Sequence, residues 1–376
     1  MIKEQKKKIL FLIHDLGGGG AEKVLVNLVN HMDHERFDVH VTALFGGGVN
    51  ENALNDQVHY RCVWKRSFPA NSRILRRMPA EWLHKICVKE KYDVEIAYLE
   101  DICAKVISGC SSKTTDLVCW IHTDLHDKSV ASRGFASFEE SQRGFAKFGR
   151  FVSVSETVQE SFLSIYPNVQ NAVVRYNTLE TERILAQKDE PIEDDLFRQD
   201  EIKLTAVGKI CQLKGFDRLA RIVKRLRDDG LPVHLYALGT GPDQRQIEAY
   251  LAENGLSDYY TFLGYQTNPY KYVAKCDLFV CASHAEGFST AATEALIVGT
   301  PVCTVEVSGM KEMLGAHNEW GVVTENDDEA LYQGIKRLVS DPALLSHYRE
   351  KAKERGKTFS TENTVKAVEA LFEKDH

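Results

Sequence analysis

The amino-acid sequence predicts an α/β protein with two domains, each built around a parallel sheet. The chain has 376 residues, of which 43% are hydrophobic, which suits two domains of ordinary size. Short apolar runs alternate with helical patterns, and runs that are apolar throughout indicate strands covered by helices on both faces. No apolar run approaches the roughly 18 residues of a membrane span. The N-terminus also lacks the pattern of a secretory signal, so we expect a cytoplasmic protein.

The expected strands form two sets of about six each. The first set is Leu10–Ile13, Val39–Leu44, Val94–Tyr98, Leu117–Ile121, Phe151–Val154 and Val173–Tyr176. The second set is Leu204–Val207, His234–Leu238, Tyr260–Leu263, Leu278–Cys281, Val302–Thr304 and Gly321–Val323. A charged stretch at 186–201 between the sets predicts a linker, which gives domains at 1–185 and 202–359. The tail, 360–376, predicts a last helix with Val365 and Val368 on one face, and we expect it to pack back on the first domain.

Composition excludes several classes of protein. The nine cysteines are an odd number without any Cys-x-x-Cys spacing, which argues against a disulfide framework and a structural zinc site. The formal charge of −7 gives no general attraction for nucleic acid. Function is therefore sought in loops that follow strands, where open parallel sheets bind ligands.

The first such loop is Gly17-Gly18-Gly19-Gly20, which precedes a predicted helix. Backbone amides at a helix N-terminus approach phosphates closely. No register gives G-x-G-x-x-G, and no acidic residue ends the second strand, so an NAD site is disfavoured. Close approach of some ligand remains favoured over a tight turn alone.

The second feature follows the strand Leu204–Val207. Lys209 and Lys214 lie five residues apart in a loop, where two ammonium groups can converge on one diphosphate. Spacing alone slightly favours ordinary solvated lysines. A further glycine turn at Gly239, after the next strand, strengthens the phosphate interpretation.

The third feature follows the strand Leu278–Cys281. A helix start near Ser289 places Glu286 in the preceding loop and Glu294 on the helix. Both carboxylates can accept hydrogen bonds from hydroxyl groups. For an isolated match, a solvated loop residue and a helix-surface charge are the more common interpretation.

Together these features resemble retaining glycosyltransferase family 4. The matching pieces are GGGGAE, GKICQLKGF, LGTGP, FLGYQTNPY and EGFSTAATEALIVGTPV, in that order along nearly the whole chain. The two glutamates of the last piece, separated by seven residues, form the most specific part of the resemblance. The family's GT-B fold implies two Rossmann-like domains with parallel sheets facing across a cleft. Two departures are Lys209, where the family usually has arginine, and Ser289-Thr290, where proline or glycine is frequent.

The resemblance implies a nucleotide-sugar site in the second domain. Lys209 and Lys214 would neutralise the diphosphate, Glu294 would hold the ribose and Glu286 would contact the transferred sugar. The catalytic residues implied are Glu286, His122 and Lys214. The remaining donor-binding residues implied are Gly18, Gly19, Gly239, Leu263, Tyr265, Gly287, Phe288, Ser289 and Thr290.

The first domain would bind the acceptor through Gly20, His122 and Asp124. His122 ends the strand Leu117–Ile121. A lone histidine there is more often structural, but its expected place at the cleft favours contact with a sugar hydroxyl.

The implied reaction transfers a sugar, with UDP as the favoured nucleotide, to a saccharide or polyprenyl-diphosphate-linked acceptor. Such a reaction builds surface polysaccharide or glycolipid. Fixed cations and helix amides would stabilise the departing diphosphate, so we expect no cofactor and no metal requirement. The sequence also lacks Asp-x-Asp, the metal-holding pair of the other large glycosyltransferase fold. Alternatives are a sugar-nucleotide epimerase or hydrolase of the same fold, and a non-catalytic nucleotide-sugar-binding regulator.

Residues 61–91 carry nine basic and two acidic side chains, with aromatic and aliphatic residues between them. This composition favours contact with an anionic membrane surface, at the inner face of the cell membrane. The alternative is an ordinary helix with a basic outer face.

Overall fold

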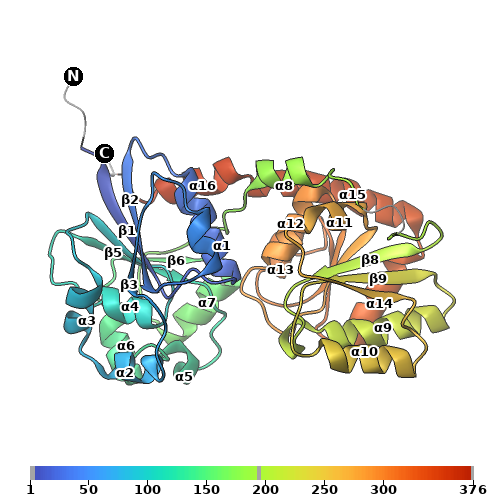
Figure 1. Ribbon diagram of the computed structural model, residues 1–376, viewed down its shortest axis with the longest axis horizontal. Helices are drawn as coiled ribbons and strands as arrows, with labels where there is room; N and C mark the ends of the chain where they lie inside the picture. Colours follow the sequence, from blue (N-terminus) through green and yellow to red (C-terminus); the bar gives the residue numbers. More distant parts are fainter. Residues whose placement is uncertain (1–4, 193–195, 374–376) are drawn as a thin grey trace. The chain divides into compact units, whose positions relative to one another are not determined.

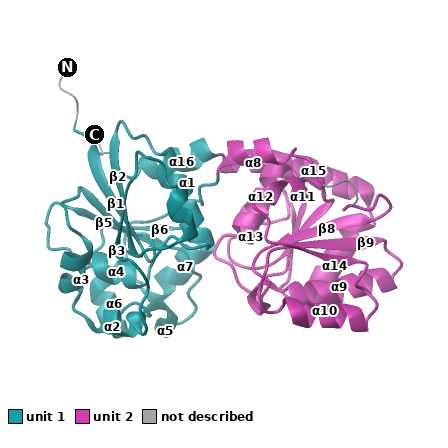
Figure 2. Ribbon diagram, in the orientation of Figure 1, with its two compact units in different colours: residues 1–179, 361–376 teal, residues 180–360 magenta. Residues whose placement is uncertain are grey.

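The computed structural model describes residues 5–192 and 196–373. The chain forms two compact units, residues 1–179 with 361–376 and residues 180–360 (Figure 2). The first boundary lies earlier than the sequence predicts, because helix α8 (Thr181–Gln187) packs on helix α12 of the second unit. The predicted linker 186–201 therefore belongs to the second unit, and its residues 193–195 lie outside the described residues. The C-terminal helix belongs to the first unit.

The first unit is a seven-stranded parallel sheet in the order β3-β2-β1-β4-β5-β6-β7 (Figure 1). Its strands are β1 (Lys7–Ile13), β2 (Phe37–Phe45), β3 (His59–Trp64), β4 (Val94–Ala97), β5 (Asp116–Ile121), β6 (Arg150–Ser153) and β7 (Ala172–Val174). Its helices are α1 (Gly20–His31), η1 (Val49–Ala53), α2 (Asn71–Arg77), α3 (Ala80–Cys87), α4 (Ile102–Ile107), α5 (Lys128–Ala131), α6 (Phe138–Phe145), α7 (Glu156–Ile165) and α16 (Thr361–Glu369).

Strand β3 is the element of this sheet that the sequence does not predict. It lies at the sheet edge, and none of its residues is fully buried. An edge strand lacks the apolar run that marks a covered strand, so its sequence HYRCVW gives a weak signal.

Helices cover both faces of the first sheet. Helix α1 packs with α16 over one face, and α4 packs with α6 over the other (Figure 1). Helix α1 buries Val24, Leu25 and Leu28, as their helical spacing predicts. In the tail, Val365 and Val368 are buried as expected, which fixes α16 to its unit.

The second unit is a six-stranded parallel sheet in the order β10-β9-β8-β11-β12-β13. Its strands are β8 (Ile202–Val207), β9 (Val233–Leu238), β10 (Tyr260–Gly264), β11 (Leu278–Cys281), β12 (Val302–Val305) and β13 (Val322–Thr324). Its other helices are η2 (Gln212–Lys214), α9 (Phe216–Asp228), α10 (Gln244–Glu253), α11 (Tyr270–Lys275), α12 (Thr290–Val298), α13 (Met310–Leu314), α14 (Asp328–Val339), α15 (Pro342–Gly356) and η3 (Lys357–Phe359).

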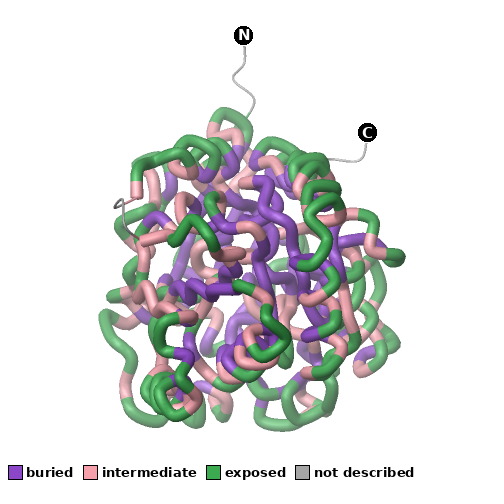
Figure 3. The backbone as a smooth tube through the Cα atoms, turned by 90° about the vertical axis from the view of Figure 1, so that its right-hand side faces the viewer, coloured by how far each residue is buried: buried purple, intermediate pink, exposed green. Residues whose placement is uncertain are grey.

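The core of the second unit lies between this sheet and its two helical layers. Helices α9, α10 and α14 pack on one face, while α12 packs with α8, α11 and α15 on the other (Figure 1). The strands are the most completely buried segments, and the helices expose their outer faces (Figure 3). Apolar residues on both faces of strands such as β9 therefore mark a doubly covered sheet, as the sequence predicts.

Each sheet has one switch point, where the chain returns to the middle and continues in the opposite direction. In the first unit this point lies between β1 and β4, and in the second between β8 and β11. Loops that follow these strand pairs meet at the carboxyl edge of the sheet, which is where such folds bind ligands.

Candidate active site

Loops at the carboxyl edge of the second sheet are tied together through their backbones. The Gly208 amide donates to the Leu238 carbonyl at 3.0 Å, and the Gly239 amide donates to the Gly264 carbonyl at 2.8 Å. Gly239 has a φ of 129°, and a Cβ there would collide with the Gly208 carbonyl oxygen. Glycine at 239 therefore allows the backbones of the loops after β8 and β9 to come into contact beside the switch point.

The structure brings Lys214 and Glu286 together at this switch point. Lys214 lies in the loop after β8 and Glu286 in the loop after β11, and Nζ lies 2.6 Å from Oε1. Their side chains are 29% and 11% exposed, so each charge has its partner in a partly water-excluded place. The solvated-loop alternative for Glu286 is therefore wrong.

Ser283 contacts Glu286, and Arg218 contacts the start of the same loop; sequence reasoning missed both. The Ser283 hydroxyl donates to Glu286 Oε1 at 2.7 Å. Arg218, only 4% exposed on α9, pairs with Asp328 at 2.7 Å and donates from Nη1 to the Ala282 carbonyl at 3.2 Å. An arginine among the core-facing residues of a helix was the available signal, because a buried guanidinium needs partners.

Helix α12 begins where the sequence predicts. Ser289 is its N-cap, and the Ser289 hydroxyl accepts from the Ala292 amide at 3.3 Å. Glu294 is 9% exposed and accepts a hydrogen bond from the Tyr270 hydroxyl at 3.4 Å. Its alternative as a helix-surface charge is therefore wrong. Phe288 is buried, and Gly287 and Thr290 are half-buried, beside this helix start.

The other predicted donor residues lie in neighbouring loops. Gln266 Nε2 donates to the Leu263 carbonyl at 2.6 Å, while Tyr265 is 77% exposed just after β10. Lys209 is exposed directly after β8. An exposed aromatic ring and an exposed ammonium group are both available to a ligand at this edge.

The glycine loop of the first unit has acidic surroundings. The Gly17 amide donates to Asp15 Oδ1 at 2.7 Å, and His14 Nδ1 lies 2.7 Å from Asp15 Oδ2. Gly18, Gly19 and Gly20 are exposed, and a Cβ at Gly19 would collide with the Glu22 carboxylate. Burial raises the pKa of Glu22, with Asp15 adding to the increase. These carboxylates make phosphate binding at this loop less favourable than the sequence alone indicates.

His122 follows β5 and presents a neutral imidazole. Its ring packs against the Tyr98 ring, with the two centroids 4.8 Å apart. Nε2 is buried and has no hydrogen-bond partner among residues 5–192 and 196–373. Burial lowers the pKa of His122 to about 4.

A buried carboxylate contacts the backbone of this histidine, and sequence reasoning missed it. Glu100, 2% exposed, accepts a hydrogen bond from the His122 amide at 3.1 Å. It follows β4 at the switch point, a position that the loop rule could have found. Asp124 is 14% exposed, with Oδ2 at 3.6 Å from His126. Its Oδ1 has no hydrogen-bond partner within the described part of the chain.

Comparison with known proteins assigns this arrangement to a family. Residues 18–183 match the family model described as Glycosyltransferase Family 4, and residues 187–356 match that of Glycosyl transferases group 1. The chain belongs to glycosyltransferase family 4. The two matches together span the carboxyl edges of both sheets.

Individual relatives of this glycosyltransferase agree with that assignment. It is 29% identical over 94% of its length to 96% of the N-acetylgalactosamine-N,N'-diacetylbacillosaminyl-diphospho-undecaprenol 4-alpha-N-acetylgalactosaminyltransferase of Campylobacter jejuni. It is 30% identical over 46% of its length to 50% of the lipopolysaccharide core biosynthesis glycosyltransferase LpsD of Rhizobium meliloti. The crystal structure of Anabaena HepE in complex with UDP superposes with a TM-score of 0.75 at 17% identity, covering 97% of this chain and 99% of that one. The fold is GT-B.

The basic segment 61–91 of the glycosyltransferase is a strand and two short helices, β3, α2 and α3, instead of one helix. Leu75 and Leu83 are buried, whereas Ile74 and Trp82 are 49% and 65% exposed. Arg73, Arg77 and Lys85 are exposed near them in sequence. Within the described residues, no helix combines the length and apolarity that crossing a bilayer requires.

Proposed function

We propose that this glycosyltransferase moves a sugar from a UDP-sugar to a saccharide or polyprenyl-diphosphate-linked acceptor in surface polysaccharide or glycolipid synthesis. The observation that carries the proposal is the Lys214–Glu286 pair at the switch point of the second unit. The Campylobacter jejuni relative, named for transfer to a diphospho-undecaprenol-linked sugar, supports the acceptor class. The UDP bound in the HepE structure supports the nucleotide.

Lys214 has a dual role in this proposal. Without a ligand it is neutralised by Glu286, which keeps both side chains in place. A diphosphate that enters the loop replaces Glu286 as the counter-charge of Lys214, and the freed carboxylate oxygen accepts a hydrogen bond from the sugar. Lys209 and the amides of residues 287–290 add positive charge around the phosphates.

The remaining donor contacts follow from the loops around this pair. Glu294 accepts hydrogen bonds from the ribose hydroxyls, and the exposed Tyr265 ring and the Leu263 backbone meet the base. Gly239 would allow a ligand to approach the backbone of the second unit closely. The acidic side chains around the glycine loop favour contact with sugar hydroxyls over contact with phosphate.

The chemistry follows from the charge that develops. Breaking the anomeric carbon–oxygen bond leaves negative charge on the departing UDP, and fixed cations stabilise it more than they stabilise the bound donor. Losing one such group costs about 3 kcal/mol of barrier. The proposed site therefore needs no metal. We propose front-face attack by the acceptor hydroxyl, whose proton passes to a phosphate oxygen of the departing UDP, so that the anomeric configuration is retained.

The first unit receives the acceptor in this proposal. His122 Nε2 and Asp124 Oδ1 have no hydrogen-bond partner in the described chain, and a sugar hydroxyl would satisfy either. Gly20, exposed at the start of α1, offers its backbone. The neutral imidazole would position the attacking hydroxyl.

A direct experiment separates this proposal from its alternatives. UDP-, GDP- and ADP-sugars are screened for thermal stabilisation, and the binding donor is then incubated, radiolabelled, with and without a lipid-linked saccharide. We expect stabilisation by a UDP-sugar and labelled product only with the acceptor, unchanged by EDTA. Product without acceptor would favour an epimerase or hydrolase, and binding without product would favour a regulator.

The membrane contact is a separate part of the proposal. Exposed Ile74 and Trp82, with Arg73, Arg77 and Lys85, suit an anionic lipid surface, where each basic residue contributes about 1 kcal/mol. Replacing the three basic residues with glutamate should lower the affinity for phosphatidylserine vesicles, measured by sedimentation, by more than about 100-fold. A matched triple replacement of Lys224, Lys351 and Lys353 on α9 and α15 should not. Equal sedimentation of the two variants would contradict the membrane contact.

A further inference from the structure

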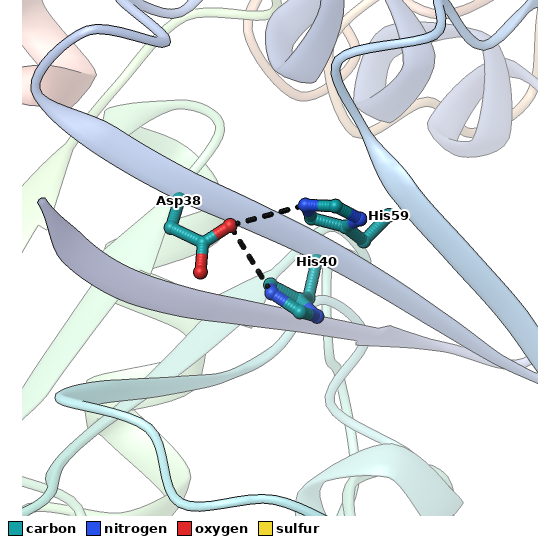
Figure 4. A group of neighbouring side chains, drawn as sticks. All are labelled: Asp38, His40 and His59. Atoms are coloured by element: carbon teal, nitrogen blue, oxygen red, sulfur yellow. Dashed lines mark ion pairs between the residues drawn. The ribbon is translucent and has the colours of Figure 1, made fainter.

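A second cluster of polar side chains lies at the amino edge of the first sheet, away from the loops described above. Asp38 and His40 are two residues apart on β2, so their side chains share one face of the sheet. His59 begins β3 and pairs directly with His40 in the strand register. The three side chains therefore converge on one point, as Figure 4 shows.

The distances between these atoms are longer than those of charge-assisted hydrogen bonds. Asp38 Oδ1 lies 3.2 Å from His40 Nε2 and 3.3 Å from His59 Nε2 (Figure 4). Charge-assisted hydrogen bonds are shorter, at about 2.7–2.9 Å. Ligands about 2.0–2.1 Å from a tetrahedral zinc ion lie roughly 3.3–3.4 Å from one another, which matches both distances.

The orientation of His40 also suits a metal ligand. Its Nδ1 lies 3.4 Å from the Tyr92 hydroxyl, which can hold the ring proton on that nitrogen. Its Nε2, facing Asp38, is buried and makes no hydrogen bond with the described residues. The lone pair of Nε2 is thus directed at the point where the three side chains converge.

The charges and exposure around this cluster suit a cation. The nearby Lys8 ammonium forms an ion pair with Glu90, so Lys8 does not neutralise the Asp38 carboxylate. The His59 side chain is 62% exposed, which gives the site an entry path and a fourth position for water. Imidazole and carboxylate together are a ligand set for zinc and for other divalent ions of the late first row.

Another cluster in the same unit is a useful contrast. His84, Glu95 and Cys110 also lie close together, but His84 Nε2 and Glu95 Oε2 are 2.7 Å apart, at normal hydrogen-bond length. Glu95 is 3% exposed, and this pair is complete without a metal. The Asp38 cluster has no contact of comparable length, since its ion pairs measure 3.2 and 3.3 Å.

We propose that Asp38, His40 and His59 bind a divalent ion of the zinc class, with one open coordination position. The ion would link the edge strand β3 to β2, and this would stabilise the start of the basic segment 61–91. It lies at the opposite edge of the sheet from His122, so it stabilises the fold without entering sugar transfer. This inference does not rest on the proposed function.

The test is calorimetric titration of ZnCl₂ into the full, tag-free chain after removal of metals by a chelator. We expect one zinc ion per chain and a higher unfolding temperature with zinc. His59→Ala should weaken this binding by more than about 100-fold, because loss of even an outer-shell partner costs 10–100-fold. His59 is exposed, so the variant should keep its fold, which circular dichroism checks.

The matched control is His84→Ala, which should bind zinc like the unaltered chain. Cobalt provides a second measurement, because a Cys110 thiolate ligand would add a strong sulfur-to-metal absorption that the proposed site lacks. Absence of zinc binding, equal binding by His59→Ala, or loss of binding in His84→Ala would each overturn the proposal.

Discussion

The carboxyl edges of the two sheets share a topology but differ in charge. At the switch point of the first unit, Asp15 and Glu22 lie beside the glycine loop, and Glu100 accepts a hydrogen bond from the His122 amide. At the switch point of the second unit, Lys214 faces Glu286, and Lys209 is exposed nearby. The same scaffold therefore presents acceptors of hydrogen bonds in one unit and cations in the other.

Under the proposed function, this difference divides two tasks between the units. A diphosphate requires fixed positive charge, which Lys214 and Lys209 of the second unit would supply. An acceptor sugar offers hydroxyl donors, which the carboxylates and imidazole of the first unit can bind. The strands determine where a ligand sits, and a few loop residues determine which ligand it is.

The largest effect should come from breaking the cation site. Lys214→Met should lower sugar transfer by about 100- to 1000-fold, because one group that stabilises the departing charge is lost. Glu286→Gln should cause a similar loss, since it removes the carboxylate that we propose contacts the sugar. Steady-state transfer assays with folded variants measure both.

Lys224→Met on α9 is the matched control for Lys214→Met. Lys224 forms an exposed pair with Asp228, and its loss should leave transfer unchanged. Near-normal transfer in Lys214→Met would remove the basis for assigning the donor site to the second unit.

Changing the acceptor side should leave donor binding intact. His122→Phe should raise the acceptor KM by about ten- to hundredfold, because a hydrogen bond worth about 1–3 kcal/mol is lost. The Kd of UDP, measured by calorimetry, should not change. A variant with weakened UDP binding and a normal acceptor KM would reverse the assignment of the two units.

The buried imidazole also predicts a pH dependence of stability. The pKa of His122 is about 4 in the folded chain and 6.5 when unperturbed. The unfolded chain therefore binds more protons between these values, and the free energy of unfolding falls as the pH drops from 6.5 towards 4. At pH 5 this contribution is about 2 kcal/mol.

Urea denaturation at pH 7 and pH 5 measures that contribution. His122→Asn lacks the titrating group, so it should lose about 2 kcal/mol less than the unaltered chain between the two values. Equal losses would show that His122 titrates normally.

The smallest effect concerns Lys209. Lys209→Arg should tighten UDP binding a few-fold, because a guanidinium contacts phosphate in two places. Lys209→Gln should weaken it by a similar factor. Calorimetry of both variants checks the opposite signs, and unchanged affinity in both would place Lys209 outside the donor site.

Much of the fold could be predicted because buried strands have a local signature. Leu278–Cys281 matches β11 at both ends, and the helix start at Ser289 follows from its capping chemistry. The edge strand β3 escaped because it is half-exposed and carries Arg61 among apolar residues. The apolar run that marks a buried strand is weaker in an edge strand, which has only one neighbouring strand.

The site could be predicted only in part. Sequence pattern found Lys214 and Glu286 separately, but their 2.6 Å contact joins residues 72 positions apart and depends on the strand order. Ser283 and Glu100 were not predicted, because their importance depends on tertiary contacts that leave no local pattern in the sequence. The proximity of Glu22 to the glycine loop likewise depends on how the side chain folds back from α1.

The most direct test of the central claim is a crystal structure of the chain with UDP. Our account predicts the β-phosphate within hydrogen-bond distance of Lys214 Nζ, with the Lys214–Glu286 contact broken. A UDP diphosphate bound elsewhere, with Lys214 still paired to Glu286, would contradict it.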